Sequence, residues 1–218
     1  MWFGLSVVLA LLQAWAAQHG WRTVRFFAKP GVMVALLAWL WSSVGLGGIP
    51  QWFAAGLLFS LAGDVFLLWP ERGFLSGLLA FLLAHVAYIV GFNTPASIFS
   101  GWGIFLAVIV GVGSARLLRR VIQAVEKQGK GALRIPIAVY GLVISLMLLS
   151  AMLKLMDISW QAGAASLVAG GAALFYFSDV VLAWNRFVSP IKNGQILNNL
   201  LYHAGQMALI AGVIWQFR

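Results

Sequence analysis

The chain has 218 residues, of which 62% are hydrophobic and 9% are charged, and its formal net charge is +9. So few polar residues cannot coat a soluble globule, and the composition therefore excludes a soluble protein. Basic loop residues in a membrane protein orient helices and contact anionic lipid, so the positive charge does not indicate nucleic-acid binding. The absence of cysteine excludes thiolate nucleophiles and thiolate metal sites. We therefore expect an integral membrane protein that uses oxygen and nitrogen chemistry and binds no nucleic acid.

Apolar runs bounded by Gly, Pro and charged residues predict an all-α, polytopic membrane protein with eight transmembrane helices. The first run has no basic residue before it, so we expect a retained span rather than a cleaved signal peptide. The predicted spans are residues 2–18, 30–47, 52–69, 74–92, 98–118, 135–154, 162–185 and 197–216. We expect them to form a single transmembrane domain, 1–218, in which 116–134 is the only long polar loop.

The positions of the basic residues predict the orientation of the chain. The loops after the first, third, fifth and seventh spans hold all of the 14 Lys and Arg residues except Lys154 and Arg218. Positively charged loops stay in the cytoplasm, so both termini are expected on the non-cytoplasmic side. Short loops and the lack of cysteine favour the bacterial inner (cytoplasmic) membrane.

Two acidic segments indicate an internal repeat. Residues 63–69 match residues 178–184 in a small residue, Asp, Val, Leu and Trp, and residues 81–91 match 202–212 in the spans that follow. The matched segments are four spans apart, and four spans preserve direction. We therefore expect two parallel halves, about 1–97 and 98–218, related by an axis along the membrane normal.

Asp64 and Asp179 are the equivalent acids of these segments, and a carboxylate inside a bilayer costs roughly 2.5 to 3.5 kcal/mol on insertion scales. The helical rise places both roughly 8 Å inside the cytoplasmic boundary. One interpretation is that the pair forms a functional centre. The alternative is that each acid fastens helices by pairing with Lys29, Arg186 or a tyrosine hydroxyl.

Other polar side chains are expected to converge on the same depth as the two acids. Lys29 and Arg186 would lie at the rim, where they suit the phosphate of an amphiphile whose reacting bond sits below. His85 would lie roughly 10 Å deeper, either as a hydrogen-bonding residue between helices or as a ligand or proton relay. A histidine metal site is not expected. The polar groups that complete the predicted site are Ser60, Ser178, Asn198, Tyr202 and Gln206.

The same positions carry a resemblance to a known family. The motifs are Lys29-Pro30, Phe59-Ser60-Leu61-Ala62-Gly63-Asp64, Phe81 with His85 and Tyr88, Pro136 with Tyr140, Ser178-Asp179, Phe187, and Tyr202 with Gln206. In this order and spacing they resemble the YhhN-like lysoplasmalogenase family of eight-span membrane proteins. The resemblance runs from about residue 29 to about residue 212.

The resemblance implies a hydrolase without a metal or organic cofactor that cleaves the vinyl ether bond of lysoplasmalogens. Its products would be a fatty aldehyde and a glycerophospho-ethanolamine or glycerophospho-choline. Asp64 and Asp179 would then be the catalytic pair, one neutral as general acid and the other ionised to stabilise positive charge and activate water. The groups that would orient the ether oxygen or the water are His85, Tyr88, Tyr140, Tyr202 and Gln206, with Lys29 and Arg186 on the phosphate.

Paired membrane acids in a repeat also fit a proton-coupled transporter or a carrier of a lipid or small amphiphile. Three features weigh against transport. The third and seventh spans show no break at mid-membrane, both acids lie toward one side, and a parallel repeat lacks the inverted symmetry used for alternating access. A structural or receptor protein is the third alternative, and it predicts no chemical product.

Overall fold

The structure is a computed structural model that describes residues 1–94 and 101–218. Within these residues it is all-helical. The eight α-helices of the described chain are α1 (Trp2–Gln18), α2 (Arg22–Val44), α3 (Pro50–Phe66), α4 (Pro70–Phe92), α5 (Gly101–Lys127), α6 (Arg134–Leu153), α7 (Ala162–Ala183) and α8 (Gly194–Phe217). Short 3-10 turns flank α6, and a π-helix, Trp184–Val188, continues α7.

Five stretches are long and apolar enough to cross a membrane, judged by length and composition. They are Arg22–Val44, Glu71–Phe92, Gly101–Lys127, Gly131–Met156 and Ala162–Val188. The chain is therefore a multi-pass integral membrane protein. Helix α8 has a similar length, but Asn198, Asn199, His203 and Gln206 lower its hydropathy.

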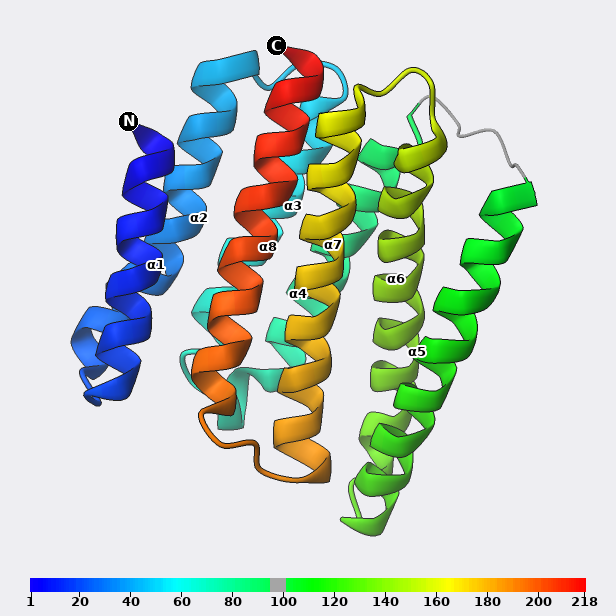
Figure 1. Ribbon diagram of the computed structural model, residues 1–218. Helices are drawn as coiled ribbons and strands as arrows, with labels where there is room; N and C mark the ends of the chain where they lie inside the picture. Colours follow the sequence, from blue (N-terminus) through cyan, green and yellow to red (C-terminus); the bar gives the residue numbers. More distant parts are fainter. Residues whose placement is uncertain (95–100) are drawn as a thin grey trace.

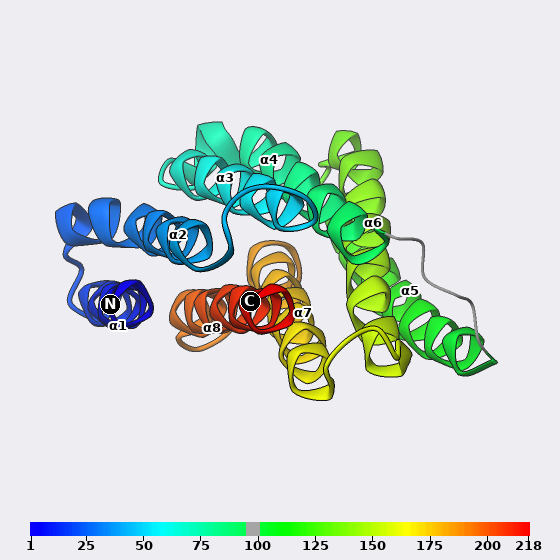
Figure 2. The same ribbon diagram turned by 90° about the horizontal axis from the view of Figure 1, so that it is seen from above.

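The helices form an upright bundle in which helices that follow one another in sequence run in opposite directions (Figure 1). Seen from above, α7 and α8 lie beside α3, with α1 and α2 on one flank and α5 and α6 on the other (Figure 2). Helix α8 contacts α7, α1, α2 and α3, while α4 contacts α3 and α6. Both chain termini lie at the same end of the bundle (Figure 1).

Glycines allow the helices that carry the site to approach closely. A Cβ atom on Gly171 would lie 2.6 Å from the backbone nitrogen of Leu209, so the backbones of α7 and α8 are in contact there. In the neighbouring hairpin, Gly56 makes room for the ring of Tyr88, because a Cβ on Gly56 would lie 2.1 Å from the Tyr88 ring. These contacts fix the positions of α7 against α8 and of α3 against α4.

Two predicted boundaries are wrong. Helix α2 begins at Arg22 instead of residue 30, so Pro30 lies inside the helix. Helix α5 continues to Lys127, so most of the expected polar loop at 116–134 is helical. Lys, Arg, Glu and Gln are good helix formers, so charged residues mark the end of an apolar span without ending the helix. The predicted helix start at residue 98, and the boundary between the repeat halves, lie outside the described residues.

Candidate functional site

Asp64 lies in the last turn of α3, where it is 0% exposed. Its Oδ1 atom forms an ion pair with Lys29 Nζ of α2 at 3.0 Å. The Tyr202 hydroxyl of α8 donates a 2.9 Å hydrogen bond to Oδ2. The charge of this carboxylate is therefore compensated within the bundle, as a buried charge requires.

Asp179 lies near the end of α7 and has different partners. The Tyr140 hydroxyl of α6 donates a hydrogen bond to Asp179 Oδ2. The His85 Nε2 atom of α4 lies 3.3 Å from the same oxygen and 3.1 Å from the Tyr140 hydroxyl. The Asp179 side chain is 12% exposed, whereas His85 is fully buried. This acid is thus held by a tyrosine and a histidine, with no lysine or arginine ion pair among residues 1–94 and 101–218.

The position of His85 corrects the expected depth. A histidine roughly 10 Å deeper than the acids could not lie 3.3 Å from Asp179. Counting residues from the predicted span ends therefore misjudged the relative heights of the two helices.

A shared aromatic wall separates the two acid sites. The Phe175 ring lies 4.7 Å from the His85 ring and 5.1 Å from the Tyr202 ring, measured between centroids. The carboxyl groups of Asp64 and Asp179 are close enough to interact electrostatically. In the described part of the chain, however, no hydrogen bond joins them. The two acids therefore have separate sets of contacts.

A buried chain of hydrogen bonds runs beside Asp64. The Tyr88 hydroxyl donates to Gln206 Oε1 at 2.7 Å, and Gln206 Nε2 donates to Ser60 Oγ at 3.0 Å. Ser60 lies one helical turn before Asp64 on the same face of α3. The amide and hydroxyl groups are satisfied by each other, so this chain ties α4, α8 and α3 together.

Ser178 and Asn198 form a second link between α7 and α8. Asn198 Nδ2 donates to the carbonyl oxygen of Ser178 at 2.8 Å and to its hydroxyl at 2.9 Å. Because Ser178 directly precedes Asp179, this link fixes the backbone of α7 next to the acid. These hydrogen bonds link α7 to α8. Within the described residues, neither side chain hydrogen-bonds to any other predicted site residue.

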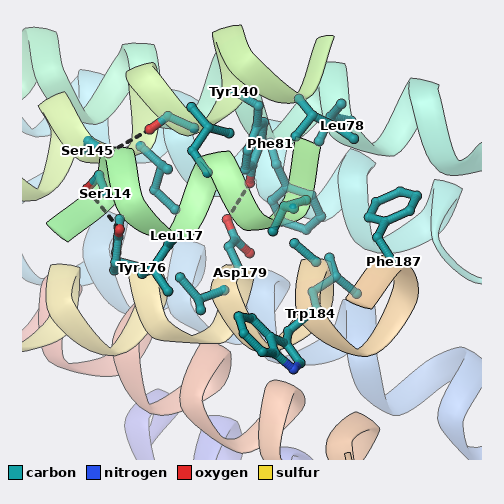
Figure 3. Close-up of a pocket in the computed structure, with 18 of the residues that line it drawn as sticks. Leu78, Phe81, Ser114, Leu117, Tyr140, Ser145, Tyr176, Asp179, Trp184 and Phe187 are labelled. Carbon is teal, nitrogen blue, oxygen red and sulfur yellow. Dashed lines mark hydrogen bonds between the residues drawn. The ribbon is translucent and has the colours of Figure 1, made fainter. Parts of the chain in front are cut away.

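An apolar cavity opens beside Asp179, with an empty volume of about 840 Å³ that is partly open to the surroundings. Figure 3 shows Tyr140 pointing at Asp179 inside a wall of leucine, phenylalanine and tryptophan side chains. Ser114 and Tyr176 add one polar contact, a 2.8 Å hydrogen bond between their hydroxyls. Asp179 and Tyr140 thus present polar atoms to a space that suits a hydrocarbon chain.

Arg186, which is expected at the rim of the site, packs against an aromatic ring. Its guanidinium carbon lies 4.1 Å from the centroid of the Phe74 ring, which is a cation–π contact. Phe74 lines the apolar cavity, and Arg186 is within electrostatic reach of Glu71. Arg186 therefore lies next to a residue of the apolar cavity wall.

Sequence analysis missed three arginines near Lys29. Arg22, Arg25 and Arg72 line a second, polar cavity together with Lys29. The three cations on α2 are Arg22, Arg25 and Lys29. They are spaced i, i+3 and i+7, which places them on one helical face. This signal was present in the sequence, but it could be used only if the helix was known to begin at Arg22.

Within the described residues there is no cluster of three or more His, Cys, Asp or Glu side chains that could hold a metal ion. The fold and the site define an integral membrane protein with two acids inside its helical bundle, one of which lies in the wall of an apolar cavity. Residues 24–213 match the YhhN family. The chain belongs to this family.

Relatives with assigned names support the same grouping. The human lysoplasmalogenase TMEM86B is 31% identical over 179 residues, which are 81% of this chain and 70% of the human protein. The mouse lysoplasmalogenase TMEM86B is 30% identical over 199 residues, 90% of this chain and 77% of the mouse protein. The human lysoplasmalogenase TMEM86A is 31% identical over 164 residues, 73% of this chain and 63% of that protein. No solved structure matches the chain.

Proposed function

We propose that this protein is a membrane-embedded lysoplasmalogenase. It hydrolyses the vinyl ether bond of 1-alkenyl-glycerophosphoethanolamine or 1-alkenyl-glycerophosphocholine to a fatty aldehyde and the glycerophospho-alcohol. The observation that carries the proposal is the Asp179 carboxyl group, which lies with Tyr140 in the wall of the apolar cavity. The names of the relatives support the same activity.

The reaction needs one proton donor and one water. A proton is added to the second carbon of the alkenyl chain, which turns the first carbon into an oxocarbenium ion. Water adds to this first carbon and loses a proton, giving a hemiacetal. The hemiacetal hydroxyl then gives up its proton to become the aldehyde carbonyl. The bond between the first carbon and the glycerol oxygen breaks, and the glycerol oxygen takes up a proton. Carboxyl groups serve both proton steps, as they do in glycoside hydrolysis.

Asp179 is the general acid in this scheme. Among the described residues both of its side-chain contacts, from Tyr140 and His85, are to Oδ2. The other oxygen is therefore free to carry the proton toward the cavity and deliver it to the alkenyl carbon. After transfer, the carboxylate accepts a proton from the attacking water, and Tyr140 and His85 hold it in place.

Asp64 is the ionised partner. Its ion pair with Lys29 and its hydrogen bond from Tyr202 favour the carboxylate form. A fixed negative charge within electrostatic reach of Asp179 stabilises the positive charge of the oxocarbenium ion. Asp64 acts through this field, and the Tyr88, Gln206 and Ser60 chain beside it keeps α3 in position.

The proposal includes the topology expected from the sequence: eight spans, both termini on the non-cytoplasmic side of a bacterial inner membrane, and two parallel halves in one domain. The helix contacts support the repeat. Helix α2 packs on α3 and α8, and the equivalent α6 packs on α7 and α4. Asp64 on α3 is held from α2 and α8, while Asp179 on α7 is held from α6 and α4. The helices that hold the two acids therefore correspond in the proposed repeat, although the contacting residues differ.

The test is mass spectrometry of the purified protein incubated with 1-alkenyl-, 1-acyl- and 1-alkyl-lysophosphoethanolamine. We expect aldehyde from the alkenyl lipid and no product from the other two, because only a vinyl ether forms an oxocarbenium ion on protonation. Release of fatty acid from the acyl lipid would contradict the proposal. Movement of intact alkenyl lipid across proteoliposomes without any aldehyde would instead establish a carrier.

A further inference from the structure

The second cavity lies where α2 begins, where α3 turns into α4 and where α8 begins, at the end of the bundle opposite the termini (Figure 1). Its empty volume is about 1480 Å³, and it opens to the surroundings. We call it the cationic pocket. The residues that define it here are Arg22, Arg25, Lys29, Glu71, Arg72 and Asn199.

The charges in the cationic pocket are unequal. Four cations and one acid, Glu71, line it. Lys29 is already paired with Asp64 at 3.0 Å. The three arginines remain as lining cations, and the one acid, Glu71, is also within electrostatic reach of Arg186. Guanidinium groups bind phosphate oxygens through parallel hydrogen bonds. The pocket therefore combines a phosphate-binding side with one carboxylate that suits a cation.

Asn199 provides an independent sign that the cationic pocket binds a polar ligand. Its side chain lines the pocket, is only 3% exposed, and carries an amide nitrogen that has no hydrogen-bond partner within the described residues. A buried donor without a partner is costly. A ligand oxygen in the pocket would satisfy it.

Two aromatic rings also line the cationic pocket. Phe26 and Trp69 both line it, and their rings meet at 75° with centroids 5.7 Å apart. The face of an aromatic ring attracts an ammonium group. Glu71 follows Trp69 by two residues, so a carboxylate and an aromatic ring lie close together in sequence.

The pocket is also next to the proposed reaction site. Leu67 lines both the cationic pocket and the apolar cavity. Lys29 lines the pocket and pairs with Asp64. A lysophospholipid with its chain in the apolar cavity would therefore reach the pocket with its polar end.

We infer that the cationic pocket binds the headgroup of a zwitterionic lysophospholipid, with the phosphodiester on Arg22, Arg25 and Arg72 and the headgroup ammonium on Glu71. This inference rests on the proposed function for its choice of lipid. Glu71 is then the residue that distinguishes ammonium headgroups from uncharged ones, because a glycerol headgroup offers it no cation.

The test uses 1-alkyl lysophospholipids, which keep the headgroup but cannot be hydrolysed as vinyl ethers. Native mass spectrometry of the detergent-solubilised protein gives Kd values for the phosphoethanolamine, phosphocholine and phosphoglycerol forms. We expect the two ammonium lipids to bind about tenfold more tightly than the glycerol lipid, the change expected for one charge-assisted contact. Glu71→Gln should remove this preference, and Glu71→Lys should reverse it.

One further variant tests the phosphate contact, and another serves as a control. Arg25→Gln should weaken all three lipids by about the same factor, because they share the phosphodiester. Glu126→Gln removes an exposed acid at the end of α5, which pairs with Arg134, and should change no Kd. An unchanged lipid preference in both folded Glu71 variants would overturn the inference.

Failure of this inference can be told from failure of the proposed function. The 1-alkyl lipids test headgroup binding alone, whereas aldehyde release from the alkenyl lipid tests the chemistry. Glu71-dependent binding without aldehyde release would support the pocket and refute the hydrolase. Aldehyde release with a Glu71-independent Kd would support the hydrolase and refute the pocket.

Discussion

The two intramembrane acids differ in their partners and in their access. Asp64 is fully buried, and a lysine and a tyrosine compensate its charge. Asp179 lies in the wall of a cavity and contacts a tyrosine and a histidine. Both are aspartates on helices of one bundle, so the difference comes from the residues brought by the neighbouring helices.

Two similar acids with such different contacts can have different roles in one reaction. An acid that must give up and regain a proton needs contact with substrate and partners that tolerate both protonation states. An acid that must stay ionised needs a fixed counter-charge and no route for its proton. Asp179 has the first set of properties and Asp64 has the second.

The largest effect is expected when Asp179 can no longer donate a proton. In Asp179→Asn we expect the rate of aldehyde release to fall by a factor on the order of 10² to 10⁴, the usual contribution of a general acid. The binding of the 1-alkyl analogue should be unchanged, because asparagine fills the same space. Aldehyde release by mass spectrometry measures the rate. Asp157→Asn, which changes an acid in a loop, is the control and should keep normal turnover.

The Asp64 side is tested through its counter-charge. Lys29→Met leaves a buried carboxylate without its cation, so we expect a loss of about 3 to 5 kcal/mol in the free energy of unfolding. Adding Asp64→Asn to the same chain should restore most of this loss. Reversible unfolding in mixed micelles measures all four chains of the cycle. Additive effects of the two substitutions would show that the ion pair contributes nothing.

The two tyrosines that donate hydrogen bonds to the acids are expected to have different roles. Tyr140→Phe removes the hydrogen bond to Asp179, so we expect kcat to fall by about ten- to a hundredfold with KM unchanged. Tyr202→Phe removes the tyrosine hydrogen bond to Asp64. This substitution should lower the stability of the protein and have less effect on kcat than Tyr140→Phe. Steady-state kinetics and thermal unfolding of both variants measure this difference. Equal losses of kcat would mean that the two acids have the same role.

Asp157 offers a carboxylate outside the predicted spans, where we expect the smallest effect. Partial burial raises the pKa of the Asp157 carboxyl, but hydrogen bonds from Lys154 and Ser159 outweigh it and hold that pKa below its usual value. A lowered pKa contributes stability that is present above the ordinary Asp value of about 3.9 and is lost as the pH falls through the folded value. The contribution should be at most about 1 kcal/mol.

The check for Asp157 is the melting temperature of the native protein and of Asp157→Asn between pH 6 and pH 3. The variant should melt slightly lower at pH 6, and the two curves should converge at the acidic end. A difference in melting temperature that stays constant across this range would show that the stability contributed by Asp157 does not depend on its charge.

Much of the bundle was predictable from apolar periodicity, which gave an all-helical membrane protein and located both acids on helices. The pairing of Asp64 with Lys29 was foreseen only as one of several partners, and the structure selects it. Helix ends were harder to predict, because arginine and lysine continue a helix beyond the apolar core. The early start of α2 at Arg22 therefore hid the cationic pocket.

The contacts of His85 show a second limit of sequence analysis. Its distance from Asp179 depends on the relative heights of α4 and α7, and these are set by packing between helices that are far apart in sequence. Residue counting along single helices contains no information on that height. The apolar cavity was also beyond prediction, because its wall combines α3, α4, α5, α6 and α7.

The most direct test of the central claim is the hydrolysis of 1-alkenyl-lysophosphoethanolamine in deuterated water, followed by mass spectrometry of the aldehyde. Protonation of the alkenyl carbon by an exchangeable acid predicts one deuterium on the second carbon of the aldehyde from the native protein. The folded Asp179→Asn variant should bind the 1-alkyl analogue and release almost no aldehyde. Aldehyde without deuterium at that carbon, or normal turnover by Asp179→Asn, would contradict the account.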